Sequence, residues 1–447
     1  YPEVEYLANY SIGGLHPVQL GDRIGPSKTP KRFRIIHKLG NGSFGTVWLC
    51  RDEQHRRWRA VKVLSADSSK SNNGESELKI FDQFFRGVDY SAIVQNGIQA
   101  PIESFRFRGP NGEHLCIVMP LLGPSLENMT GYYGHLPGLV RDISFQLIRA
   151  VEFMHRHRVC HGDFRPSNIL FRLVDEVNSW SEQQMMQVLG KPVILPVRAL
   201  RRGMTLPRGI PPYLVENAAF RYDQGVCSTR VVVVDFGLAW GNTEVPSTGT
   251  GMPPPYAAPE DCFGLGGLMS YKADIWSLGA TVAHLAAGHS PFGGNSDDAE
   301  YNPRESMTAM EQVMGPMPQP YRRVWVSLPD IPYQVPDDEK KFASVTRNLY
   351  TPESGTPAFL LGWLNAQRPV SKVTMNQATD IMTQYKRDPS RLPYFYRQQG
   401  ADDGNRALVL ASQDPRLYNF LTWIFRWMPN TRPYAHELRA HPWFAQK

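Results

Sequence analysis

The N-terminal part of the chain alternates between short apolar runs and turn-forming residues, a pattern that predicts a small antiparallel sheet. Three strands are expected at Phe33–Leu39, Thr46–Cys50 and Trp58–Leu64. A further strand pair should end at Leu115–Met119. The residues before them, 1–32, are rich in Gly and Pro and read as an extended lead-in.

Helical spacing dominates the rest of the chain and also interrupts the strands once. Glu77, Phe81 and Phe84 recur at i, i+4 and i+7, which predicts a helix over Glu75–Phe85. After Gly123 the pattern turns helical. The expected helices are Val140–His155, the buried Asp274–Ala287 and a last segment ending at Phe444, and the first of them has an apolar stripe of Ile143, Leu147, Val151 and Met154. A strand-rich first part followed by a helical second part indicates an α+β fold.

Two stretches are too long for ordinary connections. Residues from about 174 to 230 contain proline and have weak periodicity, so we expect an insert there. A longer insertion, from about 290 to 414, mixes helices with many Pro and Gly residues. The expected organisation is therefore an N-terminal extension (1–32), a first lobe (33–123) and a second lobe (124–447) with both inserts.

Composition narrows the class of protein. The 447 residues suit two packed lobes, and 42% hydrophobic with 20% charged residues is ordinary for a globular enzyme. The net charge of +6 is spread over short basic runs, so we expect no direct nucleic-acid partner. No apolar run is long enough to cross a membrane, and no signal peptide is visible. Because the chain begins with Tyr1, it could lack its natural N-terminus and any targeting signal there.

The cysteines indicate a reducing compartment. There are five of them, widely spread and without a C-x-x-C pair. An odd and scattered set argues against a disulfide framework or a zinc site. We therefore expect a cytoplasmic or nuclear protein. We also expect no membrane partner and a monomer.

The first chemical motif is a glycine-rich turn, Gly40-Asn41-Gly42-Ser43-Phe44-Gly45-Thr46-Val47. Its glycines let backbone amides approach phosphate oxygens without a Cβ in the way. A plain hairpin turn is the alternative. The motif lies between two expected strands rather than at the start of a helix, which favours a phosphate-covering hairpin over a dinucleotide-binding loop.

Lys62 follows in the middle of the apolar strand Ala60-Val61-Lys62-Val63. A buried lysine needs a partner, and the alternative is a lysine that faces solvent by alternation. At this distance after Gly45 it fits a lysine that binds the α- and β-phosphates. Glu77 is the favoured ion-pair partner, because it lies on the helical stripe, and Glu75 is the second choice.

Two further motifs bring carboxylates to the ends of apolar runs. In His161-Gly162-Asp163-Phe164-Arg165-Pro166-Ser167-Asn168, the carboxylate of Asp163 could accept a hydroxyl proton and Asn168 could bind a metal. Capping residues of a loop are the alternative there. Val231–Val234 predicts a strand that ends in Asp235-Phe236-Gly237, where a Mg²⁺ ligand is expected.

Together with Ala258-Pro259-Glu260 and Asp274-Ile275-Trp276-Ser277-Leu278-Gly279, these motifs resemble the eukaryotic protein kinase family over about residues 33–447. The resemblance implies a bilobal fold, with ATP and Mg²⁺ bound between a β-rich lobe and a helical lobe. It also implies that Glu260 pairs with Arg432 and that Asp274 braces the loop that carries Asp163.

The resemblance assigns roles to individual residues. The catalytic set is Asp163, Arg165, Lys62 and Glu77, and the metal ligands are Asn168 and Asp235. The nucleotide contacts would be Leu39, Gly40, Asn41, Gly42, Ser43, Phe44, Gly45, Val47, Ala60, Lys62, Met119 as gatekeeper, Leu121, Leu122 and Leu170.

A closer similarity lies upstream, in Gly13–Asp22 and in Thr46-Val47-Trp48-Leu49, which look like the start of SR-protein kinases and their fungal relatives. Both inserts agree with that group. The implied substrate is serine or threonine in Arg/Ser-rich proteins such as splicing factors. Three positions depart from the family pattern, namely Gly162 for the usual Arg, Arg165 for the usual Lys, and Ala257 for the usual Arg.

Acidic residues after the Asp274–Ala287 helix could attract a basic peptide. They are Asp297, Asp298, Glu300, Glu305 and Glu311, with Arg304 among them. Solvation of a loop is the alternative.

We expect an ATP-dependent Ser/Thr protein kinase. The other hypotheses are a catalytically weak kinase-fold scaffold that binds nucleotide and partners, and a small-molecule kinase.

Overall fold

The computed structural model describes residues 4–42, 44–70, 72–129, 136–199, 205–220, 225–241, 245–246, 249–293, 303–327, 375–392 and 414–445. The chain forms two compact units. The first contains residues 1–124, 171–228 and 390–397, and the second contains 125–170, 229–389 and 398–447. Each unit is described by itself below, and the lobe boundaries expected from the sequence stay a prediction.

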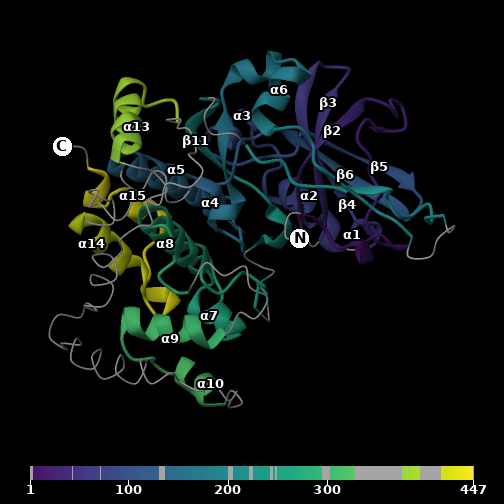
Figure 1. Cartoon of the computed structure of the whole chain (residues 1–447). Coiled ribbons are helices and arrows are strands. Elements are labelled where there is room, and N and C mark those ends of the chain that lie inside the picture. Colours follow the sequence, from purple (N-terminus) through teal and green to yellow (C-terminus); the bar gives the residue numbers. More distant parts are fainter. Residues whose placement is uncertain are drawn as a thin grey trace. The chain divides into compact units, whose positions relative to one another are not determined.

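The first unit is built on a six-stranded antiparallel sheet with the order β1-β2-β3-β4-β6-β5 (Figure 1). The strands are β1 (Arg23–Ile24), β2 (Phe33–Gly42), β3 (Gly45–Asp52), β4 (Arg57–Leu64), β5 (Glu103–Gly109) and β6 (Gly112–Pro120). The three strands and the strand pair expected from apolar alternation are confirmed. In this register Lys62 lies opposite Val47 on one side and Ile117 on the other.

Alternation along the strands gives the sheet two different faces. The lysine face carries Lys62 together with Leu64, Leu115 and Ile117, against which Leu78 of α2 packs. The opposite face, called the covered face below, carries a cluster of buried apolar side chains. It is formed by Phe33, Ile35, Trp48, Cys50, Val61, Val63, Phe105, Cys116 and Val118.

The covered face is closed by two segments that flank the strands in sequence. Val18 and Ile24 come from the N-terminal extension, and Val215 comes from the expected insert. The two segments also contact each other, because the Leu20 amide donates to the Tyr213 hydroxyl at 3.0 Å. The extension is therefore part of the hydrophobic core of the first unit.

The insert contains short regular elements that its weak periodicity did not predict. They are the 3-10 helix η3 (Asp175–Ser179), α6 (Glu182–Leu189), β9 (Ile194–Pro196) and β10 (Tyr213–Val215), with β9 and β10 paired antiparallel. Side chains of the sheet hold these elements, since Trp58 Nε1 donates to the Trp180 carbonyl at 3.1 Å and Arg34 pairs with Glu182 at 2.7 Å. The next strand, β11 (Cys227–Val233), begins three residues before the expected end of the insert at 230 and pairs with β8 (Ile169–Leu173).

Three helices complete the first unit, namely α1 (Ala66–Lys70), α2 (Asn72–Phe84) and α3 (Tyr90–Gln95). The helix expected over Glu75–Phe85 is α2, which begins three residues earlier and ends one residue earlier. The extension caps α1, because the carbonyls of Gly13 and Gly14 accept from the amides of Asp67 and Ala66 at 2.7 and 3.0 Å. These bonds satisfy amides at a helix start, which have no partner within the helix.

The second unit is helical, as its periodicity predicts. Its α-helices are α4 (Leu126–Met129), α5 (Pro137–Arg156), α7 (Pro259–Cys262), α8 (Lys272–Ala287), α9 (Pro303–Met314), α10 (Tyr321–Ser327), α13 (Met375–Arg387), α14 (Pro415–Ile424) and α15 (Ala435–Arg439). The last element is η9 (Pro442–Phe444).

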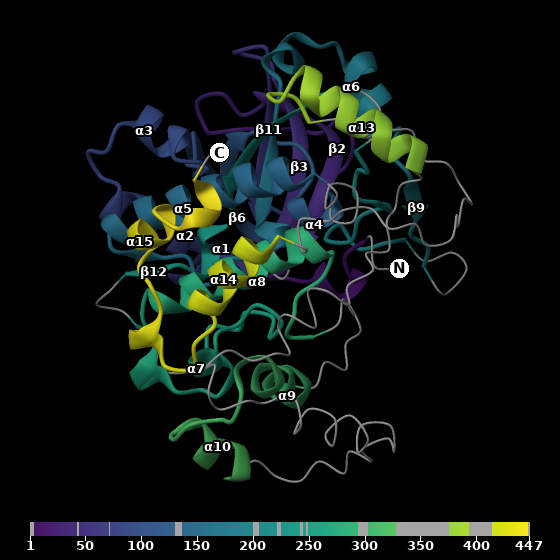
Figure 2. The same ribbon diagram turned by 90° about the vertical axis from the view of Figure 1, so that its left-hand side faces the viewer.

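Helix α8 is the centre of this unit, because every one of its residues is buried. Helices α5 and α14 lie against it (Figure 2). The stripe predicted on α5 is also buried, with Ile143, Leu147, Val151 and Met154 all at 0% exposure. Across the described residues, no helix is long and apolar enough to span a membrane.

Candidate active site

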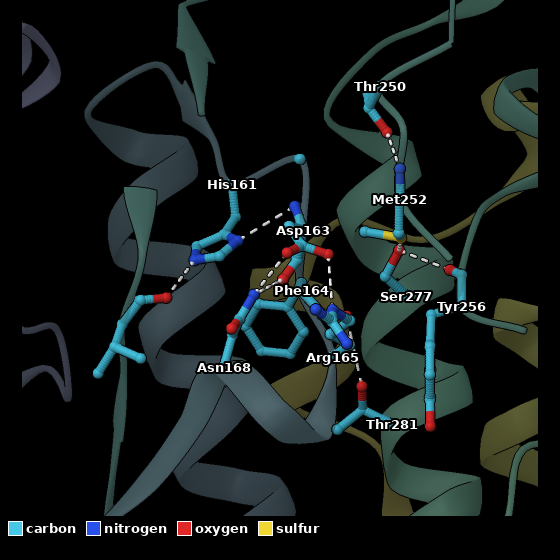
Figure 3. A network of polar contacts seen from close by, with 12 residues as sticks. His161, Asp163, Phe164, Arg165, Asn168, Thr250, Met252, Tyr256, Ser277 and Thr281 are labelled. Atoms are coloured by element: carbon cyan, nitrogen blue, oxygen red, sulfur yellow. Dashed lines mark hydrogen bonds and ion pairs between the residues drawn. The ribbon is translucent and has the colours of Figure 1, made fainter. Parts of the chain in front are cut away.

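The loop between β7 (Val159–Cys160) and the 3-10 helix η2 (Pro166–Asn168) holds the carboxylate of Asp163 in a fixed position. Arg165 Nε donates to Asp163 Oδ1 at 2.9 Å. Asn168 Nδ2 donates to the Asp163 carbonyl at 2.9 Å and to Asp163 Oδ2 at 2.7 Å (Figure 3). Because Nδ2 makes both bonds, Asn168 keeps its oxygen for another ligand.

His161 orients the same loop from behind. The Asp163 amide donates to His161 Nδ1 at 3.2 Å, so Nδ1 is the acceptor nitrogen of the ring. Nε2 then carries the proton and donates to the Val234 carbonyl at 3.1 Å. This contact ties the loop to the backbone just before Asp235.

Asp274 of α8 braces the loop, as the resemblance implied. Its carboxylate accepts from the amides of His161 and Gly162 at 2.8 and 3.2 Å and from His155 Nε2 at 3.0 Å. Burial alone would raise the pKa of Asp274, but the hydrogen bonds and charge of His155 and the hydrogen bond from His161 keep it below its ordinary value. The carboxylate is therefore held ionised under the loop.

Gly162 departs from the pattern of the family that the sequence resembles, and the backbone explains why no side chain is present. Its φ is +74°, and a Cβ there would lie 2.4 Å from the Leu238 carbonyl oxygen. L residues rarely adopt this conformation, and no Cβ tolerates so close a contact. The conformation and the contact together favour glycine at this position.

Asp235 follows β11 with a left-handed backbone, φ 65° and ψ 78°. Its side chain is exposed. A carboxylate here and the amide oxygen of Asn168, both in the second unit, form an oxygen donor set of the kind that Mg²⁺ prefers. These residues fit a divalent metal.

The glycine-rich hairpin of the first unit joins β2 to β3, with Asn41 opposite Thr46 and Gly42 opposite Gly45. Added Cβ atoms at Gly40 and Gly42 would meet nothing within 4 Å, so the backbone there borders open space. Only Gly45 is required by packing, because its Cβ would lie 2.4 Å from the Val63 carbonyl. Ser43 lies outside the described residues. An open glycine backbone fits a phosphate group.

The ion pair expected between Lys62 and Glu77 forms, with 3.2 Å between Nζ and Oε2. Both side chains are largely buried, at 16% and 6% exposure. The side chain of Glu75, the second choice, lies outside the described residues.

The other expected nucleotide contacts are apolar. In the first unit Ala60 and Met119 are paired across β4 and β6, and Ala60 is buried. Phe44 is exposed, and the remaining ones are half-buried: Leu39, Val47, Leu121 and Leu122 in the first unit and Leu170 in the second. Their roles stay predictions.

The expected pair of Glu260 and Arg432 is confirmed. Arg432 Nη1 and Nη2 donate to the two Glu260 oxygens at 2.7 and 2.6 Å, and both side chains are fully buried. Arg432 also donates to the Lys272 carbonyl at 2.9 Å, which attaches the start of α8.

One polar network was not predicted by the sequence. Ser277 Oγ of α8 lies 2.9 Å from the Tyr256 carbonyl, and Thr281 Oγ1, one turn further, donates to the Phe164 carbonyl at 3.4 Å. The segment just before Tyr256 is tied in turn to Asp261. A hydroxyl every fourth residue on an apolar helix is the only signal in the sequence that could have indicated these contacts.

Most of the acidic residues considered for peptide binding have side chains that lie outside the described residues. Asp297, Asp298 and Glu300 lie outside the described residues, as do the side chains of Arg304 and Glu305. Glu311 of α9 accepts a long hydrogen bond, 3.4 Å, from the Met317 amide.

Comparisons with known proteins give a consistent result. The protein kinase domain family matches residues 33–178 and 222–444. The unmatched residues between them lie within the segment expected as an insert. A crystal structure of a kinase domain aligns over 96% of this chain and 98% of its own, with a TM-score of 0.53 and 18% identity, which shows the fold.

Among curated relatives, protein kinase dsk1 of Schizosaccharomyces pombe is 34% identical over 37% of this chain and 30% of its own length. Human SRSF protein kinase 3 is 32% identical over 40% of this chain and 33% of its own. The serine/threonine-protein kinase SRPK of Physarum polycephalum is 27% identical over 71% and 74%. The aligned region thus spans about a third of the first two relatives.

Proposed function

Because the chain belongs to the protein kinase family, we propose that it transfers the γ-phosphate of ATP to serine or threonine in proteins. The observation that carries the proposal is the carboxylate of Asp163, held on one oxygen by Arg165 and on the other by Asn168. This arrangement fixes a hydrogen-bond acceptor for the substrate hydroxyl.

Each unit has its own proposed ligands. In the first unit, the open backbone of Gly40–Gly45 and the Lys62–Glu77 pair would hold phosphate oxygens. In the second unit, Asn168 and Asp235 would hold a divalent metal, for which we propose Mg²⁺. ATP supplies the phosphoryl group when bound. Asp163 orients the acceptor hydroxyl and takes up its proton, and Arg165 places a fixed positive charge beside it.

Asp163→Asn tests the assignment. The variant should bind ATP nearly as well as the wild type and transfer phosphate several orders of magnitude more slowly, because Asn cannot take up the proton. Nucleotide affinity and turnover are measured side by side. Asp380→Asn, an exposed residue of α13, is the matched control. Turnover of Asp163→Asn near that of the control would show that Asp163 has another role, and a wild type that binds ATP without transfer would indicate a scaffold.

The substrate class is proposed from the relatives. The name of human SRSF protein kinase 3 says which proteins that relative acts on. On this basis we propose that this chain phosphorylates Arg/Ser-rich segments, such as those of splicing factors. A peptide of Arg-Ser repeats should be phosphorylated faster than the same peptide with Arg changed to Gln. If docking is electrostatic, the difference should shrink at high salt, because exposed charges are screened over about 10 Å at 0.1 M. Equal rates at low salt would contradict the basic-substrate proposal.

We also propose that the protein acts as a monomer in the cytoplasm or nucleus. Light scattering of the purified chain and imaging of a tagged copy test these two points. A stable dimer, or a signal confined to another compartment, would refute them.

A further inference from the structure

Asp261 holds the segment that precedes Ala258-Pro259-Glu260. It lies in α7, directly after Glu260. Asp261 Oδ1 accepts from the Thr250 amide at 2.6 Å, and Oδ2 accepts from the Thr250 hydroxyl at 2.5 Å. Both carboxylate oxygens are thus used on one residue eleven positions earlier, and hydrogen bonds to a charged group are among the stronger ones in proteins.

The next residues of the segment are fixed through Thr250. The Met252 amide donates to Thr250 Oγ1 at 3.2 Å, and the Met252 side chain is buried. Gly249 lies so close that a Cβ would be 2.8 Å from Asp261 Oδ1. Residues 249–252 therefore lie against the Asp261 carboxylate.

Helix α8 places this segment relative to Asp163 (Figure 3). Ser277 Oγ lies 3.4 Å from Met252 Sδ and 2.9 Å from the Tyr256 carbonyl. One turn along the same helix, Thr281 donates to the carbonyl of the residue after Asp163. The segment and the catalytic loop are thus attached to neighbouring turns of one buried helix.

Asp261 thus holds the start of the segment, and Ser277 of α8 holds its end at Tyr256. We propose that Asp261 is a positioning residue that holds residues 249–256 in the substrate-receiving conformation. The claim that this conformation receives the substrate rests on the proposed function. The claim that Asp261 holds the segment does not depend on that function.

Asp261→Asn is the main variant, because it removes the charge and one acceptor with little change in size. Hydrogen exchange of a proteolytic fragment covering 249–256 should become about tenfold faster, the factor that corresponds to 1.4 kcal/mol. The KM for a peptide substrate should rise by a similar factor, and the KM for ATP should stay within about twofold. A structural defect that loosens the whole unit would change both constants and the exchange of α8.

Three controls complete the experiment. Thr250→Val removes only the hydroxyl and should show the same pattern, whereas Thr250→Ser keeps both bonds and should behave like the wild type. Asp380→Asn makes the same chemical change on an exposed site and should alter nothing.

The proposal would be overturned if Asp261→Asn and Asp380→Asn had the same exchange rate and the same KM for the peptide. If the wild type transfers no phosphate to any substrate, the proposed function fails, while the exchange measurement still decides whether Asp261 holds the segment.

Discussion

Replacing Glu5 with Gln should destabilise the first unit by about 3–5 kcal/mol, the usual cost of removing one partner of a buried ion pair. Glu5 of the extension pairs with Lys38 of β2, and the Lys38 side chain is fully buried while that of Glu5 is 3% exposed. Lys38 Nζ also donates to the Val215 carbonyl at 3.1 Å. Burial lowers the pKa of Lys38, and Glu5 opposes that shift. Without Glu5 the lysine charge is buried and uncompensated.

Loss of the Lys38 proton sets an upper limit on the cost. At pH 7, about 3.4 pH units below the ordinary lysine pKa of ~10.4, deprotonation costs ~4.6 kcal/mol at 1.36 kcal/mol per unit. A lysine whose pKa is lowered in the folded state weakens folding below that pKa. The deficit of the variant should therefore be largest near neutral pH and should shrink as the pH rises toward ~10.

Thermal unfolding at pH 7 and pH 9.5 measures the effect. For a unit of this size 1 kcal/mol shifts Tm by about 2–4 °C, so a shift of about 6–20 °C is expected. Glu53→Gln is the control, because Glu53 forms an exposed pair with Arg23 and should change Tm by little. The double change Glu5→Leu with Lys38→Met should recover part of the loss, because it removes the unpaired charge. Recovery is incomplete because the buried Tyr10 hydroxyl and the Val215 carbonyl lose their partners. Equal melting of the Glu5 and Glu53 variants would refute the reasoning.

Three further outcomes are expected. Gly162→Ala should cost about 1–2 kcal/mol from its left-handed backbone alone and lower turnover, and an unchanged Tm and rate would contradict the steric argument. Burial alone would raise the pKa of Asp52, but Arg32 holds that pKa well below its ordinary value. Asp52→Asn should therefore lose more stability at pH 7 than at pH 3 in urea unfolding. An equal loss of stability at the two pH values would be inconsistent with that linkage. Arg432→Lys should lower stability by about 2 kcal/mol or more, because lysine cannot bond both oxygens of Glu260 at once; a melting temperature equal to that of the wild type would argue against it.

Local patterns predicted the core of the fold and one ion pair, and the family resemblance predicted a second. Apolar alternation located the strands that carry Lys62, and the helical stripe selected Glu77 as its partner, as the structure shows. The pair of Glu260 and Arg432 followed from the family resemblance. These features were predictable because each depends on periodicity over a few residues or on a motif of fixed spacing.

The attachment of the extension and the insert was not predictable in the same way. Lys38 and Val215 are 177 residues apart, and neither lies in a periodic segment that indicates its partner. Thr250 and Asp261 are closer in sequence, but a single Thr and a single Asp in a loop have no distinguishing pattern. Such contacts are set by tertiary packing rather than by a local pattern. The roles assigned to the nucleotide-binding and metal-binding residues stay predictions.

The long separation between the sheet and its cover also concerns synthesis on the ribosome. The last strand of the covered face, β6, ends at Pro120, and Val215 follows it 95 residues later. At about 5–20 residues per second, this interval lasts roughly 5–19 s. During that time the nascent chain presents an incompletely closed apolar sheet, the kind of surface that chaperones bind and that aggregates when they are scarce. Chains that stop before residue 215 should therefore be insoluble, whereas those that continue past it can complete the first unit.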